Sequence, residues 1–360
     1  MSRNRQFYPV LAVLRGPTPA TGQHFSSGNS GVNLISQLQR IQSCNHSFSI
    51  SRTDVNQFGQ LGAISREIIE QPTVSFETSW NVADVFNERM LGLYVSGDQS
   101  CVKFILDGTE DERNYFLAVA PQGQDFYGWT GQSQVVQITN GFLASYRTEG
   151  AVGGIPNASA TVQALNWAVS TGSSGQDLKA VNPVDGQVVA GRLFTLPVGT
   201  TGIVGSVAAL RPGDITVDIS NAAVGLNISD LKIQNYNLSF DLSRQNLQKL
   251  GSRFAFSKEI QFPVTVSASI TANLGDLDTG NLSDILCNDR AYDLAVTLRD
   301  PTCTGSGPVA AKYIMKSVKL DGQQFTNNLG DLASAVTLNY SCQLGGPNDS
   351  SLGFFISGKN

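Results

Sequence analysis

The stretch that decides the fold is residues 41–75, which read IQSCNHSFSISRTDVNQFGQLGAISREIIEQPTVS. Residues 233–267 read IQNYNLSFDLSRQNLQKLGSRFAFSKEIQFPVTVS, so the two stretches align without a gap at an offset of 192. Fifteen of the 35 positions are identical, where ordinary residue usage would give roughly two or three by chance. Solenoid repeats span only a few tens of residues, so this period is that of a tandem domain. The sequence predicts two copies of one domain in one chain.

The composition favours strands and turns over helices. The chain has 360 residues, of which 41% are hydrophobic and only 15% charged, and it contains 36 glycines. The length is that of two or three domains, and polar uncharged residues of this kind are typical of strands and turns. The net charge of −5 provides no basic face for phosphates, which argues against a sequence-specific nucleic-acid binder. The charge is compatible with a mildly acidic surface along which DNA could pass without binding.

The N-terminus does not have the pattern of a secretory signal, because the apolar run at residues 10–14 is short and Arg15 ends it. No stretch reaches the length of a transmembrane helix. We therefore expect a soluble chain that is cytoplasmic when made.

The five cysteines do not follow the repeat: none has a cysteine partner at the 192 offset, and Cys44 aligns with Tyr236. A disulfide framework inherent to a repeated fold would occur in both copies, so buried thiols are the favoured interpretation. A bridge between Cys287 and Cys303 is the alternative.

Alternating residues predict the first strand of each copy. His46, Phe48 and Ile50 alternate with serines, and residues 236–242 repeat the pattern with larger apolar side chains. A period of two is the signal of a half-buried strand. A second strand follows at residues 74–79 and again at 265–271. The twenty or so residues between the two strands predict a long hairpin connection.

The remaining elements complete a mainly β chain. Strands are expected at residues 101–106, 115–120, 135–139, 161–167 and 336–342, with short ones at 188–189 and 215–219, and a helix near residues 82–91. The predicted organisation is an N-terminal arm (1–32), a first domain (33–170), a connecting segment (171–224), a second domain (225–346) and a C-terminal tail (347–360).

The repeated segment resembles one known family. SRTDVNQFGQLG at residues 51–62, followed by SREI at 65–68, is similar to the tail tube proteins of long-tailed bacteriophages, and the resemblance covers about 35 residues in each half. It implies two tandem β-sandwich or barrel domains, each with a flanking helix. The tandem kind in this family forms homotrimers with pseudo-sixfold symmetry, whose inner strands close into one barrel. Such rings stack into a tube through which phage DNA passes, and the long hairpin reaches the adjacent ring.

The resemblance also implies a place in the virion tail, with sheath, tape measure, terminator or baseplate proteins as partners and no membrane. A trimeric hub or baseplate component of the tube is an alternative function. A β-rich surface adhesin is a second alternative, although the three tryptophans have no counterparts in the other half.

The alternation assigns the two faces of the predicted strands. Apolar residues at 48, 50, 74, 76, 240, 242, 266 and 268 are expected in the core. The small polar residues on the other face are expected to line the channel, or else the exposed face of an ordinary sheet: Ser47, Ser49, Ser51, Ser75, Glu77, Ser239, Asp241, Ser243, Ser267 and Ser269. Hydroxyls without lysine or arginine give a wall that does not hold phosphates.

Two charged positions persist in both copies, Arg52 with Arg244 and Glu67 with Glu259. Our hypothesis is that Arg52 pairs with Glu259, or Arg244 with Glu67, across the seam between domains. Pairs within each domain, or solvated ends, remain alternatives.

The sequence contains no recognisable catalytic motif. It has two histidines and lacks the HExxH, CxxC and phosphate-loop patterns, so we expect no enzyme and no cofactor. Acidic runs at residues 107–112 and 276–281 are better explained as solvated loops than as calcium sites, and no metal is expected.

Overall fold

The computed structural model describes residues 6–15, 35–108, 111–121, 134–171, 176–182, 186–188, 193–194, 196, 209–219, 231–274, 282, 291–302, 307–327 and 334–359. The protein is mainly β, and its principal sheet is large and antiparallel, with 15 strands. Its elements are β1 (Gln6–Arg15), β2 (Ile35–Gln37), β3 (Ile41–Ser49), β4 (Thr53–Val55), β5 (Ser65–Glu67), β6 (Thr73–Asn81), α1 (Phe86–Met90), α2 (Lys103–Leu106), β7 (Glu112–Pro121), β8 (Gln134–Ala151), β9 (Asn157–Ala164), β10 (Asn166–Thr171), β11 (Gln176–Asp177), β12 (Leu193–Phe194), the 3-10 turn Pro212–Asp214, β13 (Ile215–Ile219), β14 (Lys232–Asp241), β15 (Arg244–Leu247), β16 (Ser257–Ile260), β17 (Thr265–Asn273), β18 (Tyr292–Arg299), β19 (Val309–Thr326), β20 (Ala335–Gln343) and β21 (Gly353–Gly358).

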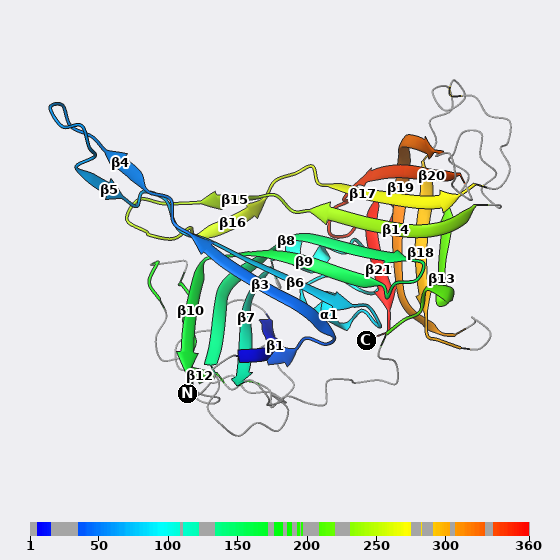
Figure 1. Cartoon of the computed structure of the whole chain (residues 1–360), viewed down its shortest axis with the longest axis horizontal. Helices are drawn as coiled ribbons and strands as arrows, with labels where there is room; N and C mark the ends of the chain where they lie inside the picture. The colour runs from blue at the N-terminus through cyan, green and yellow to red at the C-terminus, as the bar shows by residue number, and fades with distance from the viewer. Residues whose placement is uncertain are drawn as a thin grey trace.

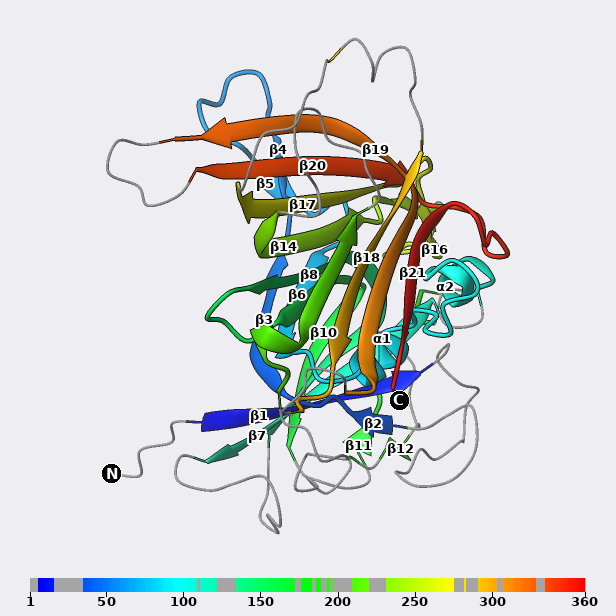
Figure 2. The same ribbon diagram turned by 90° about the vertical axis from the view of Figure 1, so that its right-hand side faces the viewer.

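Eight of these strands form a continuous antiparallel ladder in the order β3, β6, β9, β8, β14, β17, β20, β19. We call it the eight-strand ladder. Its middle is the pairing of β8 with β14, where Tyr146 lies opposite Phe240. Figure 2 shows its second half side by side as β14, β17, β20 and β19. Strands from both ends of the chain therefore share one sheet.

The two longest strands, β8 and β19, each have 18 residues and belong to two layers. Their later residues lie in the eight-strand ladder. Their earlier residues pair with β7 and β10 in one case, and with β18 and β21 in the other. Each long strand contains one residue in the left-handed region, Asn140 with φ 51° and Ser317 with φ 57°. Each lies where the strand passes from one layer to the other.

The pairings on the two sides of the β8–β14 junction follow the same succession. β3 pairs with β6, β6 with β9 and β9 with β8; β14 pairs with β17, β17 with β20 and β20 with β19. The register shifts also correspond, with one between Ile41 and Ser43 in β3 and one between Ile233 and Asn235 in β14. The hairpins β4–β5 and β15–β16 occupy the same place in each succession.

One apolar core runs through both halves, and most of the predicted core residues belong to it. Six of the eight are buried: Val74, Phe76, Phe240, Leu242, Val266 and Ala268. Phe48 and Ile50 are 54% and 40% exposed, so their prediction was wrong. Phe48 lies opposite the buried Val74, on the expected side of the sheet. It is exposed because β3 is at the edge of the ladder, where no strand in the described part of the chain pairs with its outer side.

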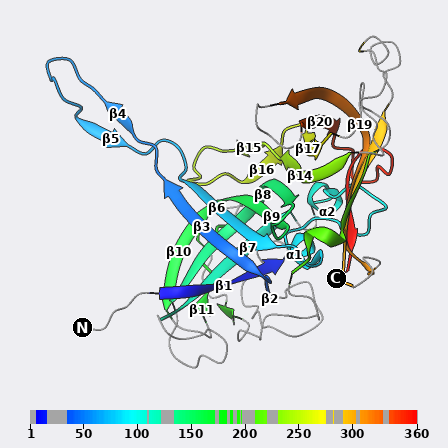
Figure 3. The same ribbon diagram turned by 45° about the vertical axis from the view of Figure 1, so that its right-hand side comes forward.

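The long connections are hairpins, as the sequence predicted. Both β4–β5 and β15–β16 leave the ladder on the same side, and β4–β5 extends well away from the rest of the chain (Figures 1 and 3). Gly59 and Gly251, at the same position in the two copies, have φ of 91° and 84°. This left-handed conformation favours glycine over residues with a Cβ.

Other predictions are confirmed or corrected by the described elements. The helix expected near residues 82–91 is present as α1, and the strands at 115–120, 135–139, 215–219 and 336–342 fall within β7, β8, β13 and β20. Residues 161–167 span the end of β9 and the start of β10. Residues 101–106 end in helix α2 instead of forming a strand, with Val102 and Ile105 buried. This spacing of three places both side chains on one helical face.

Both ends of the chain contain more structure than expected. Part of the predicted arm, residues 6–15, forms β1 against β7. The predicted tail contains β21, whose Phe354, Phe355 and Ile356 are buried. Most of the connecting segment, including residue 189, lies outside the described residues, as do residues 16–34, Cys287, Cys303 and the acidic run 276–281. Val188 forms an isolated bridge with Val181.

Candidate functional site

The polar face of the eight-strand ladder contains the residues predicted to line a channel. Eight of the ten lie on β3, β6, β14 and β17, all of them exposed or half-buried, while Ser51 and Ser243 lie in the exposed connections that follow β3 and β14. The register extends this face over all eight strands. One row crosses the ladder through Ser43, Ser79, Ser159, Arg147, Ser239, Ser267, Ser341 and Lys319.

Hydroxyl groups dominate this face and bond to each other across strands. Ser43 Oγ lies 2.6 Å from Ser79 Oγ, and Thr271 Oγ1 lies 3.3 Å from Thr337 Oγ1. Side chains bonded in this way are held against the sheet. Most of this face is therefore uncharged, and its bonded hydroxyl groups are less free to bind a ligand.

The charged groups on this face are few and mostly acidic. Glu77 and Asp241 are exposed, and Arg147 donates a hydrogen bond to Glu149 two residues along the same strand. Sequence reasoning missed Arg147 and Lys319, because it assigned faces only to the two strand pairs inside the repeated segment. The ion pair with Glu149 reduces the attraction of Arg147 for phosphate.

Just beyond the end of β14, Arg244 of β15 joins the two halves of the chain. Its guanidinium donates to both carboxylate oxygens of Asp111, at 2.6 and 2.9 Å, and to the carbonyl oxygen of Leu143 at 2.8 Å. The Arg244 side chain has no exposed surface. The bidentate geometry is that of a strong charge-assisted pair.

Within the single chain, Arg244 has a different partner from the one predicted across the seam. Arg244 binds Asp111 instead of Glu67, which is exposed on β5. Glu259 accepts a hydrogen bond from Ser257 on its own strand, and Arg52 is exposed. Asp111 is 133 residues from Arg244 in the sequence and outside the repeated segment, so the repeat gave no signal for it.

An aromatic cluster lies at the β8–β14 pairing between the halves. The ring of Tyr146 lies 5.7 Å from Phe240 and 6.5 Å from Phe354, and Phe354 stacks on Tyr313 at 6.1 Å. Glu88 of α1 lies in the same cluster and is fully buried. Its Oε1 accepts hydrogen bonds from Tyr146 Oη at 3.0 Å and from Tyr313 Oη at 3.3 Å.

The buried Glu88 makes stability depend on pH. Loss of solvent raises its pKa from an ordinary 4.5 to about 7, against the opposing hydrogen bonds of the two tyrosines. Between these values the unfolded chain releases a proton that the folded chain keeps. The free energy of unfolding is therefore expected to fall by about 3 kcal/mol from pH 4.5 to 7 and to level off above that.

The test is the pH profile of urea unfolding in the parent and in Glu88→Gln. The glutamine keeps an acceptor oxygen for both tyrosines but cannot ionise, so the profile should be flatter between pH 4.5 and 7. Equal slopes in the two proteins would contradict the assignment of this pH dependence to Glu88.

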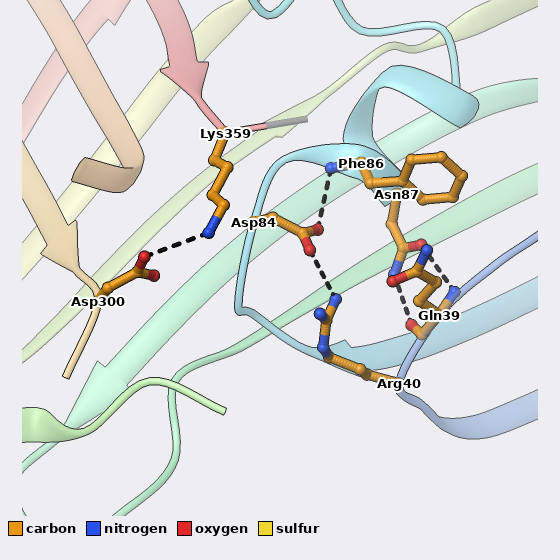
Figure 4. A network of polar contacts seen from close by, with 7 residues as sticks. All are labelled: Gln39, Arg40, Asp84, Phe86, Asn87, Asp300 and Lys359. Atoms are coloured by element: carbon orange, nitrogen blue, oxygen red, sulfur yellow. Dashed lines mark hydrogen bonds and ion pairs between the residues drawn. The ribbon is translucent and has the colours of Figure 1, made fainter. Parts of the chain in front are cut away.

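A second polar network fixes α1 beside the start of β3 (Figure 4). Arg40 Nη1 donates to Asp84 Oδ2 at 2.8 Å, and Asn87 exchanges two hydrogen bonds with the backbone of Gln39, at 2.9 and 2.7 Å. The backbone of the last strand joins here, because the Val85 N–H donates to the carbonyl oxygen of Lys359. The helix thus connects the first and last parts of the chain.

The two outer edges of the ladder have apolar side chains exposed to solvent. At the first edge these are Phe48 on β3 and Ile50 directly after it, and at the other edge it is Phe325 on β19, which is 46% exposed. Phe48 contacts Trp167 of β10, with ring centroids 5.5 Å apart. In the described strands, β3 pairs only with β6, and the later part of β19 only with β20. Unpaired strand edges of this kind are sites for pairing with another chain.

Two features of the described residues concern metal binding and thiol chemistry. Within them, no three histidine, cysteine, aspartate or glutamate side chains gather as metal ligands would. Burial raises the pKa of the Cys44 thiol to about 11 and that of Cys342 to about 12, which keeps both thiols protonated and poorly nucleophilic. None of the described helices has the length and hydropathy to cross a bilayer.

In the comparison with known proteins, no family description matches the chain, and no curated protein matches its sequence.

Proposed function

We propose that this chain is a bacteriophage tail tube subunit made of two tandem tube domains. Three copies form a ring with pseudo-sixfold symmetry, and the rings stack into a hollow tube for DNA. The observation that carries the proposal is the eight-strand ladder, which combines a hydroxyl-rich face with two edges that no further described strand pairs with. A tandem origin is supported by the 192 offset in the sequence and by the matching succession of pairings on both sides of the β8–β14 junction.

Ring closure removes the unpaired edges. Pairing β3 of one copy with β19 of the next repeats the contact that β14 makes with β8 inside each chain. This head-to-tail contact uses two different surfaces, so it gives a closed ring where the rotation between copies closes. Three ladders of eight strands make 24, and with strands ~4.8 Å apart and tilted by ~40° the barrel is about 50 Å across between backbones. A DNA duplex passes through such a bore.

The wall chemistry suits passage better than binding. Serine, threonine and asparagine keep a hydration layer, while Glu77 and Asp241 repel phosphates. A groove that holds DNA would instead present several unpaired lysines or arginines. The same face would serve a trimeric hub of the tail, which remains a second candidate because it requires the same closed barrel.

The assembly test is negative-stain microscopy of the purified full-length protein over a range of concentrations. Rings with a central hole, or tubes built from them, are expected. Elongated single copies at every concentration would overturn the proposal and favour an adhesin.

The hairpin tips are expected to control stacking. Phe58 and Leu61 on one tip and Leu250 on the other are fully exposed. At the opposite end of the β8–β14 junction lies a pocket that is lined by Pro212, Ile215, Val217 and Ile233 together with the polar Gln234 and Asn235. Apolar tips at one end and a partly apolar pocket at the other would provide a head-to-tail contact between rings.

Replacing Phe58 and Leu250 with serine should therefore leave rings but shorten or abolish tubes in micrographs. The matched control is Gln57→Ser with Lys249→Ser, beside the same two positions, and it should form tubes like the parent. Tubes of parental length in the apolar-tip variant would exclude this stacking contact.

A further inference from the structure

At three of the identical positions, the residue is exposed in the first copy of the repeat and has a buried side chain in the second. Phe240 is buried and Phe48 is exposed; Arg244 has a fully covered side chain and Arg52 is exposed. The third pair is Ala255, which is 1% exposed, and Ala63, which is exposed. Identical residues at equivalent positions are expected to meet similar surroundings. The exposed members therefore mark a surface that a single chain leaves uncovered.

In the second copy, the first half of the same chain provides the cover. Tyr146 packs on Phe240, and Asp111 binds Arg244. The hairpin β15–β16 lies over the first half, where the Ala255 N–H donates to Gln71 Oε1 at 2.6 Å. Ala255 also packs with Leu165 and Val181 in a small apolar cluster. The pairing of β8 with β14 and the hairpin β15–β16 thus both cover the boundary between the two halves.

We propose that the second half of another copy covers the exposed surface, with β19 paired to β3 in one defined register and the β4–β5 hairpin lying over that copy. The register follows from the strands already paired. Arg147 lies opposite Ser159, which lies opposite Ser79; Gln324 lies opposite Thr337, which lies opposite Thr271. Ser79 and Thr271 are related by the 192 offset, so Gln324 occupies in its half the position of Arg147.

Arg147 lies opposite Ser239, whose equivalent is Ser47. Ser47 of one copy therefore lies opposite Gln324 of the next, and the neighbouring pair is His46 with Phe325. In this register, the core side and the polar face of one ladder each continue into the same face of the next. His46 and Phe325 lie opposite the buried Phe76 and Val336, on the core side of the ladder, whereas Ser47 continues the row of hydroxyls.

A slip of one residue would destroy this match. It would move Phe325 to the polar face and a glutamine to the core side, because strand side chains alternate with a period of two. The register is thus specified by the same alternation that orients the whole ladder. This inference rests on the proposed ring, and it adds which residues of β3 and β19 pair between neighbouring copies.

The test is cross-linking of the full chain with a short bis-maleimide in the variant Ser47→Cys/Gln324→Cys. Covalent dimers and trimers are expected on denaturing gels, at several times the background of the parent with its native cysteines. Ser239→Cys/Arg147→Cys tests the reagent at the equivalent position inside one chain, and its link, located by peptide mass mapping, should leave the molecular mass that of a single chain. Ser47→Cys/Gln323→Cys is the slipped control and should give background levels only.

The outcomes separate the register from the function. Rings in micrographs without a Ser47–Gln324 link, or with a stronger link in the slipped control, overturn the register and leave the ring in place. Single copies with no link overturn both.

The hairpin cover has its own readout. Ala63→Arg adds a long side chain at an exposed position and should leave the single chain folded, with an unchanged circular dichroism spectrum and melting temperature. Association measured by sedimentation should weaken at least tenfold, because the equivalent Ala255 has no room around it. Gln60→Arg, on the exposed tip of the same hairpin, should associate within about twofold of the parent. Equal association of the two variants would show that the hairpin covers nothing within the ring.

Discussion

Replacing Phe48 with aspartate is expected to give a folded single chain that no longer forms rings. Phe48 is 54% exposed in the single chain, so its loss takes little from the core. In a ring it would be covered as Phe240 is. Burying an aromatic side chain contributes about 1.5–3 kcal/mol, and an unpaired buried carboxylate adds a further cost. Each of the three contacts between copies carries this loss, so we expect association to weaken more than a hundredfold.

Sedimentation velocity over a range of protein concentrations measures this change. Val152→Asp is the matched control for ring formation, since Val152 is 65% exposed and lies beyond the end of β8, away from both ladder edges. Val152 lines the pocket proposed to receive the hairpin tips, so this substitution should affect only the stacking of rings. It should form rings like the parent. Phe240→Asp should instead unfold the single chain, because the equivalent residue is 2% exposed there. If Phe48→Asp associates like Val152→Asp, the β3 edge is not an interface.

Arg244→Ala is expected to destabilise the single chain by about 3–5 kcal/mol, the usual cost of removing one partner from a buried ion pair. The substitution leaves the Asp111 carboxylate, which is only 21% exposed, without its bidentate partner. It also removes the donor to Leu143 on β8 and the donor to Lys258 on β16. The two halves and the hairpin β15–β16 all lose a contact at one point.

Urea unfolding, followed by tryptophan fluorescence, measures the loss. The control is Arg66→Ala, whose partner Asp54 lies on the β4–β5 hairpin with both side chains about half exposed or more. Exposed pairs contribute between zero and about 1 kcal/mol, so this control should stay close to the parent. Similar midpoints for Arg244→Ala and Arg66→Ala would mean that the pair with Asp111 does not hold the halves together.

The repeat predicted the local structure well because strand alternation is a local property. It placed β3, β6, β14, β17 and both hairpins, and it assigned the side to which each residue points. It could not tell what covers that side. Phe48 and Phe240 have the same pattern around them, and only the position of β3 at the edge of the ladder distinguishes them.

Other features could not be predicted because they depend on long-range contacts or lie in short apolar runs. Asp111 lies 133 residues from Arg244, and no local pattern connects them. Residues 101–106 are apolar enough for a strand or a buried helix, and a run of six residues does not decide between them. The run Phe354–Ile356 is buried on both sides, so it has no alternation to mark it as a strand.

The unequal hairpins have a consequence for whatever meets the end of the proposed tube. A ring of three chains would present six projections of two kinds, one kind tipped by Phe58 and the other by Leu250. Proteins that cap, extend or surround such a cylinder would meet a threefold rim, although the bore is close to sixfold. A capping protein with three arms could bind three equivalent hairpin tips, whereas three of six identical arms would meet tips of the other kind and bind less well.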